Sequence, residues 1–74
     1  MITTTTFKKT VEQIERNYAL AQTVESSSTR RTFYDQAFGM VTLASVLIDA
    51  DEYGALCDLW NEYRVKFETL IYGA

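Results

Sequence analysis

The chain has 74 residues, of which 47% are hydrophobic and 23% are charged, with seven basic and ten acidic side chains. This balance is typical of one small folded domain and excludes intrinsic disorder. The net charge of −3 has the wrong sign for attracting nucleic acid phosphates, and the chain lacks histidine, the commonest general base. We therefore expect a single small domain over residues 1–74 that is not an enzyme and holds no cofactor.

The short length of the chain favours association with another subunit. A domain of this size buries only about 60% of the surface that its unfolded chain exposes, so its stability is marginal. Small domains usually compensate with disulfides, a metal ion or a partner subunit. The lone Cys57 cannot form an internal disulfide, and the sequence shows no cluster of metal ligands. We therefore expect a homo-oligomer, most simply a dimer.

The sequence shows no targeting or membrane segment. Residues Met1–Thr6 are mostly threonine, without the basic start and apolar run of a signal peptide. The longest apolar stretch, Ala37–Ile48, is interrupted by Thr42 and Ser45 and is too short to span a bilayer. An unpaired cysteine fits a reducing compartment. We expect a cytoplasmic protein that does not associate with membranes.

The first predicted helix covers about residues 5–24. Lys8, Glu12 and Arg16 follow one side of it at four-residue steps, which forms a ladder of opposite charges. Apolar side chains on the other side recur at alternating steps of four and three, which keeps them on one stripe. These apolar residues are Phe7, Val11, Ile14, Tyr18 and Ala21. This pattern predicts a helix with one packed face and one solvent face.

The second predicted helix, about residues 29–48, follows a loop rich in serine. Its apolar and small side chains span an arc of roughly 220°, whereas a surface helix needs about 100°. Val46 interrupts the one strip of this helix that suits solvent. That strip consists of Asp35, Gly39, Thr42 and Asp49. Such a helix must be covered on several sides. It is either simply the central helix of a bundle, or part of its arc is an interface.

The third predicted helix covers about residues 51–72. Asp49 can cap it, and Glu52 stands at the position that completes a capping box. Apolar residues then follow a heptad seam. The seam consists of Tyr53, Leu56, Trp60, Tyr63, Phe67 and Leu70. With short connections between its segments, the chain is predicted to be an all-α, three-helix up-down-up bundle.

Candidate chemical sites are weak in this sequence. The run Asp49–Gly54 resembles the opening of a calcium loop, but Tyr53 and Trp60 stand at the fifth and twelfth positions, where oxygen ligands are needed. A helix cap explains the acidic residues better. Cys57 has no histidine to make it a thiolate, and a core position is the better interpretation. We therefore expect no catalytic residues and no metal site.

The leading functional hypothesis is a small non-catalytic helical protein-interaction module that self-associates. The wide apolar arc of the second helix and the lack of any other stabilising device favour it. Tyrosine, tryptophan and arginine are the usual anchors of protein interfaces. The predicted interface residues are Tyr34, Phe38, Val41, Ser45, Ile48, Tyr53, Trp60 and Arg64. Val46 is expected to face out of the monomer's own bundle.

Two alternatives remain open. The first is a nucleic-acid-binding helical domain that uses Lys8, Lys9, Arg16, Arg30 and Arg31. The predicted topology counts against it, because an up-down-up bundle brings Lys8 and Lys9 near the acidic start of the third helix. It also brings Arg30 and Arg31 near Glu68 and Glu25. The second alternative is an acidic inhibitor that occupies a basic site on its target. It would use Asp35, Asp49, Asp51, Glu52 and Asp58.

Overall fold

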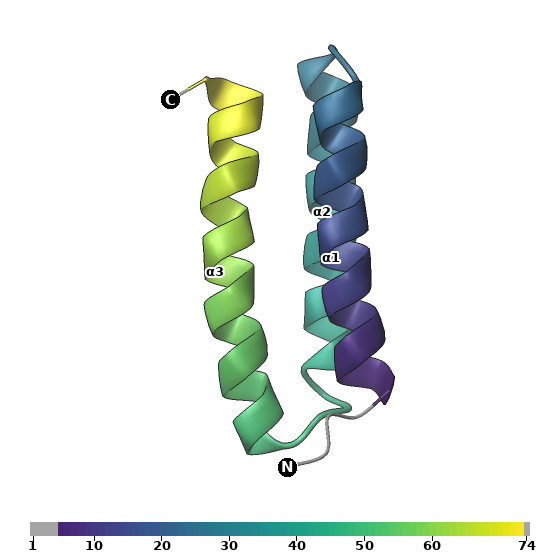
Figure 1. The fold of residues 1–74 in the computed structure, drawn as a ribbon, viewed down its shortest axis with the longest axis vertical. Coiled ribbons are helices and arrows are strands. Elements are labelled where there is room, and N and C mark those ends of the chain that lie inside the picture. The colour runs from purple at the N-terminus through teal and green to yellow at the C-terminus, as the bar shows by residue number, and fades with distance from the viewer. Residues whose placement is uncertain (1–4, 74) are drawn as a thin grey trace.

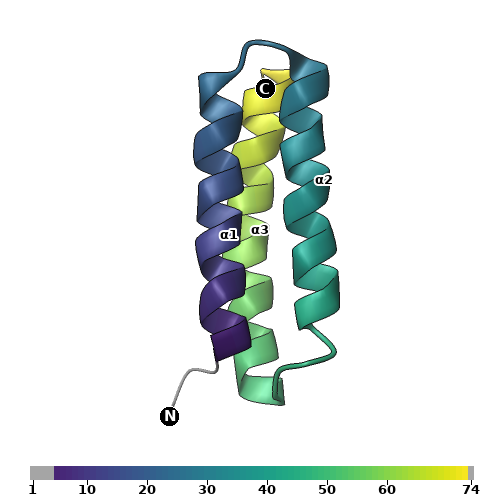
Figure 2. The ribbon, with the colours of Figure 1, turned by 90° about the vertical axis from the view of Figure 1, so that its right-hand side faces the viewer.

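A computed structural model describes residues 5–73, which form three helices side by side (Figure 1). Helix α1 spans Thr5–Thr23, α2 spans Ser27–Ala44 and α3 spans Ala50–Tyr72. Helices α1 and α3 run in the same direction and α2 runs antiparallel to both (Figure 2). The prediction of an all-α, three-helix up-down-up bundle is confirmed.

Helix α2 begins two residues earlier than predicted because Ser26 caps it. The backbone N–H of Thr29 donates to Ser26 Oγ at 3.4 Å, and Ser26 has the extended backbone of an N-cap. Residues Ser27 and Ser28 therefore belong to the first turn of the helix, although a hydroxyl-rich run is typical of a loop.

Helix α2 also ends four residues earlier than predicted. The backbone N–H groups of Val46 and Leu47 donate to the carbonyls three residues before them, at 3.4 and 2.9 Å, which tightens the chain into a turn. Asp49 must adopt an extended backbone to cap α3, so the chain has to leave α2 before it. The apolar pattern continues through residues 46–48 and therefore did not reveal this helix end.

Both ends of α3 carry recognisable caps. Asp49 Oδ1 accepts a hydrogen bond from the backbone N–H of Glu52 at 2.9 Å, which confirms the predicted cap. At the other end Gly73 adopts a left-handed conformation with φ 68°, and its N–H donates to the Thr69 carbonyl at 2.8 Å. Glycine takes this conformation without steric cost, so the helix stops there.

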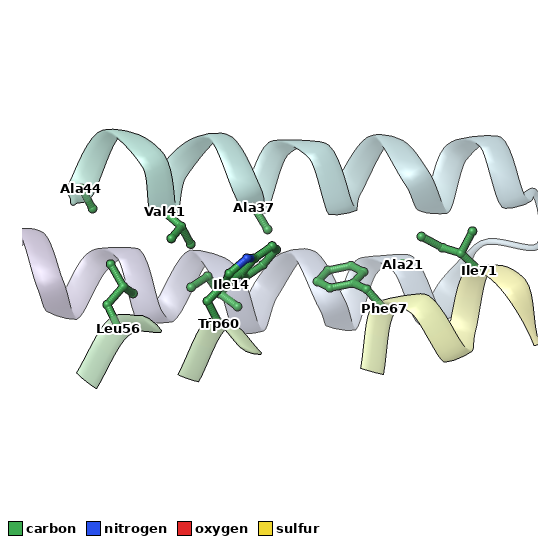
Figure 3. Close-up of a cluster of buried hydrophobic side chains, with 9 residues drawn as sticks. All are labelled: Ile14, Ala21, Ala37, Val41, Ala44, Leu56, Trp60, Phe67 and Ile71. Atoms are coloured by element: carbon green, nitrogen blue, oxygen red, sulfur yellow. The ribbon is translucent and has the colours of Figure 1, made fainter. Parts of the chain in front are cut away.

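The core is assembled from side chains of unequal size (Figure 3). Its largest buried side chains come from α3, whereas α2 contributes only two alanines and a valine. The nine buried hydrophobic residues are Ile14, Ala21, Ala37, Val41, Ala44, Leu56, Trp60, Phe67 and Ile71. Because the distance between packed helices depends on the side chains at the contact, small residues let α1 and α2 approach closely, and the bulk of α3 fills the remaining space.

Two buried polar residues on α1 are satisfied within their own helix. The Thr10 hydroxyl donates to the Thr6 carbonyl at 2.7 Å, and Asn17 Nδ2 donates to the Gln13 carbonyl at 2.8 Å. Burial of these side chains is therefore compatible with the close contact between helices, because buried polar groups need a hydrogen-bond partner.

An aromatic cluster centred on Phe67 joins the three helices. The fully buried Phe67 ring lies 5.2 Å from Tyr18 on α1, 5.5 Å from Tyr34 on α2 and 6.4 Å from Trp60 on its own helix, measured between ring centroids. The contact with Tyr18 is edge to face, at an interplanar angle of 80°. Such aromatic pairs add about 0.5–1.5 kcal/mol each beyond the burial of their surface. Phe67 is therefore the residue on which all three helices meet.

Replacing Phe67 with alanine should lower the free energy of unfolding by about 3–5 kcal/mol, because it removes a buried ring and leaves a cavity between all three helices. Urea denaturation followed by circular dichroism measures this loss. Val65→Ala, two residues away and 55% exposed, is the matched control and should change the value by less than about 0.5 kcal/mol. Equal effects of the two substitutions would contradict the central role of Phe67.

Candidate functional site

The predicted interface residues occupy three kinds of environment. Val41 and Trp60 are buried in the monomer's own core, at 8% and 7% exposure. Phe38 and Tyr53 are about half exposed, at 53% and 48%. The remaining four are partly buried, and they are Tyr34, Ser45, Ile48 and Arg64. Within the monomer, Phe38 and Tyr53 are therefore the two members of the set with large exposed side chains.

Phe38 covers the buried indole of Trp60 where α2 meets α3. The rings of Tyr34 and Phe38, one helical turn apart on α2, both stack on Trp60, at centroid distances of 5.7 and 5.9 Å. Their interplanar angles to Trp60 are 13° and 21°. Phe38 thus holds a fixed position through one face of its ring while much of its surface stays open to solvent.

Arg64 makes a local contact instead of standing free as an anchor. Its Nη1 lies 3.2 Å from Glu68 Oε2, one turn further along α3, and both side chains are 42% exposed. A pair of this kind at the surface contributes about 0–1 kcal/mol. To serve in an interface, Arg64 would have to break its ion pair with Glu68, or the interface would have to include both side chains.

Tyr53 is linked to Cys57, one turn further along α3. A hydrogen bond with the Cys57 side chain, together with the electrostatic interaction between the two side chains, raises the pKa of the Tyr53 phenol above its ordinary value. Cys57 itself is partly buried, whereas the sequence suggested a core position. Because Tyr53 is about half exposed, its ring and hydroxyl form an amphipathic surface residue of the kind found at protein interfaces.

Three strongly exposed apolar residues near the α2–α3 turn were missing from the predicted set. Leu43, Val46 and Leu47 are 69%, 79% and 68% exposed. The outward position of Val46 agrees with its place in the solvent strip of the predicted helix. Because α2 ends early, Leu47 lies in the turn after it. The apolar sequence pattern continues past the end of α2 and therefore did not predict this position of Leu47.

The arginines at the start of α2 form hydrogen bonds within the chain. Arg30 Nε donates to the Val24 carbonyl at 2.9 Å, and its Nη1 donates to the Leu70 carbonyl at 3.0 Å near the end of α3. Arg31 Nη1 donates to the Tyr72 hydroxyl. These contacts place the guanidinium groups where the α3 dipole is negative. They are intramolecular, as expected, but with carbonyls and a hydroxyl instead of Glu25 and Glu68.

An open apolar hollow lies between α1 and α3. It is lined by Tyr18, Val65, Lys66, Thr69 and Leu70. The Lys66 ammonium lies 4.7 Å from the centroid of the Tyr63 ring, a cation–π distance that keeps this charge beside its own helix. The lining residues include no carboxylate and no cysteine, and the Lys66 charge lies beside Tyr63, so the hollow suits an apolar contact better than a reaction.

Known proteins add no constraint on the function of this chain. Comparisons with protein-family models, curated protein sequences and solved structures gave no match. Among residues 5–73, no group of three or more histidine, cysteine, aspartate and glutamate residues could hold a metal ion, and no helix is long and apolar enough to cross a membrane. The exposed apolar residues near the α2–α3 turn are therefore the most informative feature of the described surface.

Replacing Arg30 with glutamine should lower the free energy of unfolding by about 1–2 kcal/mol, because both carbonyl contacts of the guanidinium are lost. Arg16→Gln is the control, since Arg16 is exposed on α1, and it should change the value by less than about 0.5 kcal/mol. Thermal or urea denaturation measures both variants. If Arg30→Gln is as stable as the parent chain, the contacts with Val24 and Leu70 contribute nothing to the fold.

Proposed function

We propose that this chain is a small non-catalytic helical module that binds protein, and that its partner is a second copy of itself. The observation that carries the proposal is the uneven distribution of exposed apolar side chains. Among residues 5–73, eight large hydrophobic side chains are exposed, and five of them lie between residues 38 and 53. These five are Phe38, Leu43, Val46, Leu47 and Tyr53. Concentrations of exposed apolar surface mark interaction sites in soluble proteins.

The lack of charge around these residues supports the same function. No aspartate, glutamate, lysine or arginine occurs between Gln36 and Ile48, although this stretch contains four of the five exposed side chains. Depletion of charged residues with enrichment in aromatic ones is the compositional mark of an interface core. A solvent-facing helix surface with no partner would ordinarily carry charges there.

A second copy is the partner that best fits the size of the chain. A three-helix domain of this length has a small core, and a partner subunit is a common way to add buried apolar surface. We place this assembly in the cytoplasm, where the unpaired Cys57 would remain a thiol. The contacts of Arg30 and Arg31 within the fold count against nucleic acid as the partner.

Self-association is tested by light scattering on samples diluted from about 100 to 1 μM, a range in which a small interface is expected to dissociate. The parent chain should show twice the monomer mass at high concentration. Val46→Glu should shift the population towards monomer, because it places a charge in the apolar surface. The circular dichroism spectrum should not change, since Val46 is 79% exposed in the monomer.

The matched control is Val65→Glu, which introduces the same charge at a 55% exposed valine on α3, away from the five residues. It should associate as the parent chain does. A parent chain that is monomeric over the whole range would refute self-association. Equal weakening by both substitutions would mean that added negative charge alone, and not the position of Val46, opposes the assembly.

A further inference from the structure

The hollow between α1 and α3 has the size and the lining of a small-molecule site. Its volume is about 380 Å³, and pockets for small organic ligands span about 300–1,000 Å³. Such pockets are mostly apolar, with a few polar groups that orient the ligand. The hollow combines both kinds of group, because its lining consists of Tyr18, Val65, Lys66, Thr69 and Leu70. This lining suits a molecule that is apolar over most of its surface and polar at one end.

Aromatic contacts hold one wall of the hollow in place. The Tyr18 ring meets Tyr63 edge to face at a centroid distance of 5.7 Å, and it meets Phe67 in the same way at 5.2 Å. Phe67 is fully buried, so the Tyr18 ring is anchored to the core. A wall that is fixed before binding reduces the entropy lost when a ligand binds. The hollow is therefore a preformed feature of the surface between the two helices.

The hydroxyl groups of the lining are not used within the fold. The hydroxyls of Thr10, Thr32 and Thr42 each donate to a backbone carbonyl one turn earlier in their own helix. Within the described part of the chain, the hydroxyls of Thr69 and Tyr18 make no hydrogen bond. Both groups can therefore bind a polar atom that enters the hollow.

Lys66 supplies the charge at the edge of the hollow. Its ammonium lies 4.7 Å from the centroid of the Tyr63 ring, and that ring contacts Tyr18. Among the residues that the structure describes, the ion pair is that of Arg64 with Glu68, so the Lys66 ammonium is not neutralised by a carboxylate. None of the lining residues is acidic. The hollow thus presents one positive charge beside apolar surface, which is complementary to an anion.

We propose that this hollow binds a small amphipathic anion, namely a carboxylate at the end of an aliphatic chain. The carboxylate accepts hydrogen bonds from the Lys66 ammonium and the Thr69 hydroxyl, which are neighbours on α3 because they are three residues apart. The aliphatic chain lies on Val65, Leu70 and the ring of Tyr18. The site is separate from the exposed apolar residues between positions 38 and 53, so the proposal does not depend on self-association.

The openness of the hollow limits the affinity. Charge-assisted hydrogen bonds are stronger than neutral ones and orient the ligand, but part of the aliphatic chain stays in contact with water. For a chain of ten carbons, we expect a dissociation constant of about 1 mM, since ligands of this size gain little free energy per atom.

Sodium decanoate is the probe that tests the proposal. The ¹⁵N-labelled chain is titrated with decanoate up to about 10 mM, roughly ten times the expected dissociation constant, and amide chemical shifts are recorded by NMR. The shifts should saturate and should be largest for Tyr18 and residues 65–70. Smaller changes are expected on α2, since none of its residues lines the hollow.

Two substitutions test the polar contacts. Lys66→Gln removes the charge at nearly constant length and should raise the dissociation constant at least fivefold. Thr69→Val removes the hydroxyl at nearly constant shape and should raise it at least twofold. Lys9→Gln is the matched control, because it removes the same charge from an exposed lysine on α1 outside the hollow, and it should keep the parent value. Circular dichroism should show the same helix content in all four chains.

Three results would overturn the proposal. The first is the absence of saturating shifts up to about 10 mM decanoate, ten times the expected dissociation constant. The second is a set of shifts centred on residues 38–53, which would place the probe on the exposed apolar residues near the α2–α3 turn. The third is an equal dissociation constant for Lys66→Gln and Lys9→Gln. None of these results bears on self-association, which light scattering measures without decanoate.

Discussion

The contact between Phe67 and the two other helices holds this fold together. Phe67 is fully buried and touches an aromatic ring on each of α1 and α2, so this single residue joins all three helices. The neighbouring Trp60 extends this cluster towards the α2–α3 turn. Because a domain of this length has little surplus stability, the positions of the helices depend on this aromatic cluster more than on the isolated surface ion pair of Arg64.

The unequal size of the core residues has an effect on the surface. Helix α3 supplies bulky side chains that fill the interior, so α2 needs only alanine and valine on its inner side. The large side chains of α2 therefore lie at its flanks and on its outer side. Phe38 stacks on Trp60, and Leu43 is exposed to solvent. A core built mainly by one helix thus leaves apolar surface on another, and this surface is the basis of the proposed self-association.

The number, type and direction of the helices could be predicted because apolar spacing and caps such as Asp49 are local signals. The end of α2 could not, because residues 46–48 continue the apolar pattern although the chain already tightens into a turn at Val46 and Leu47. Among the predicted interface residues, the exposure of Phe38 and the burial of Val41 depend on how α3 rotates against α2. Helical periodicity alone does not determine this rotation. The hydrogen bonds of Arg30 within the fold could not be predicted from the sequence either, because their acceptors are backbone carbonyls.

Arg30 has a consequence for the order in which the chain folds. One of its acceptors, Val24, is six residues away, and the other, Leu70, is 40 residues away. The near contact can form as soon as α1 and α2 pair, and it then orients the guanidinium before α3 arrives. The entropy of fixing this long side chain is lost in the early step, so the later contact closes at a lower cost. The first two helices can in this way serve as a template on which the third one docks.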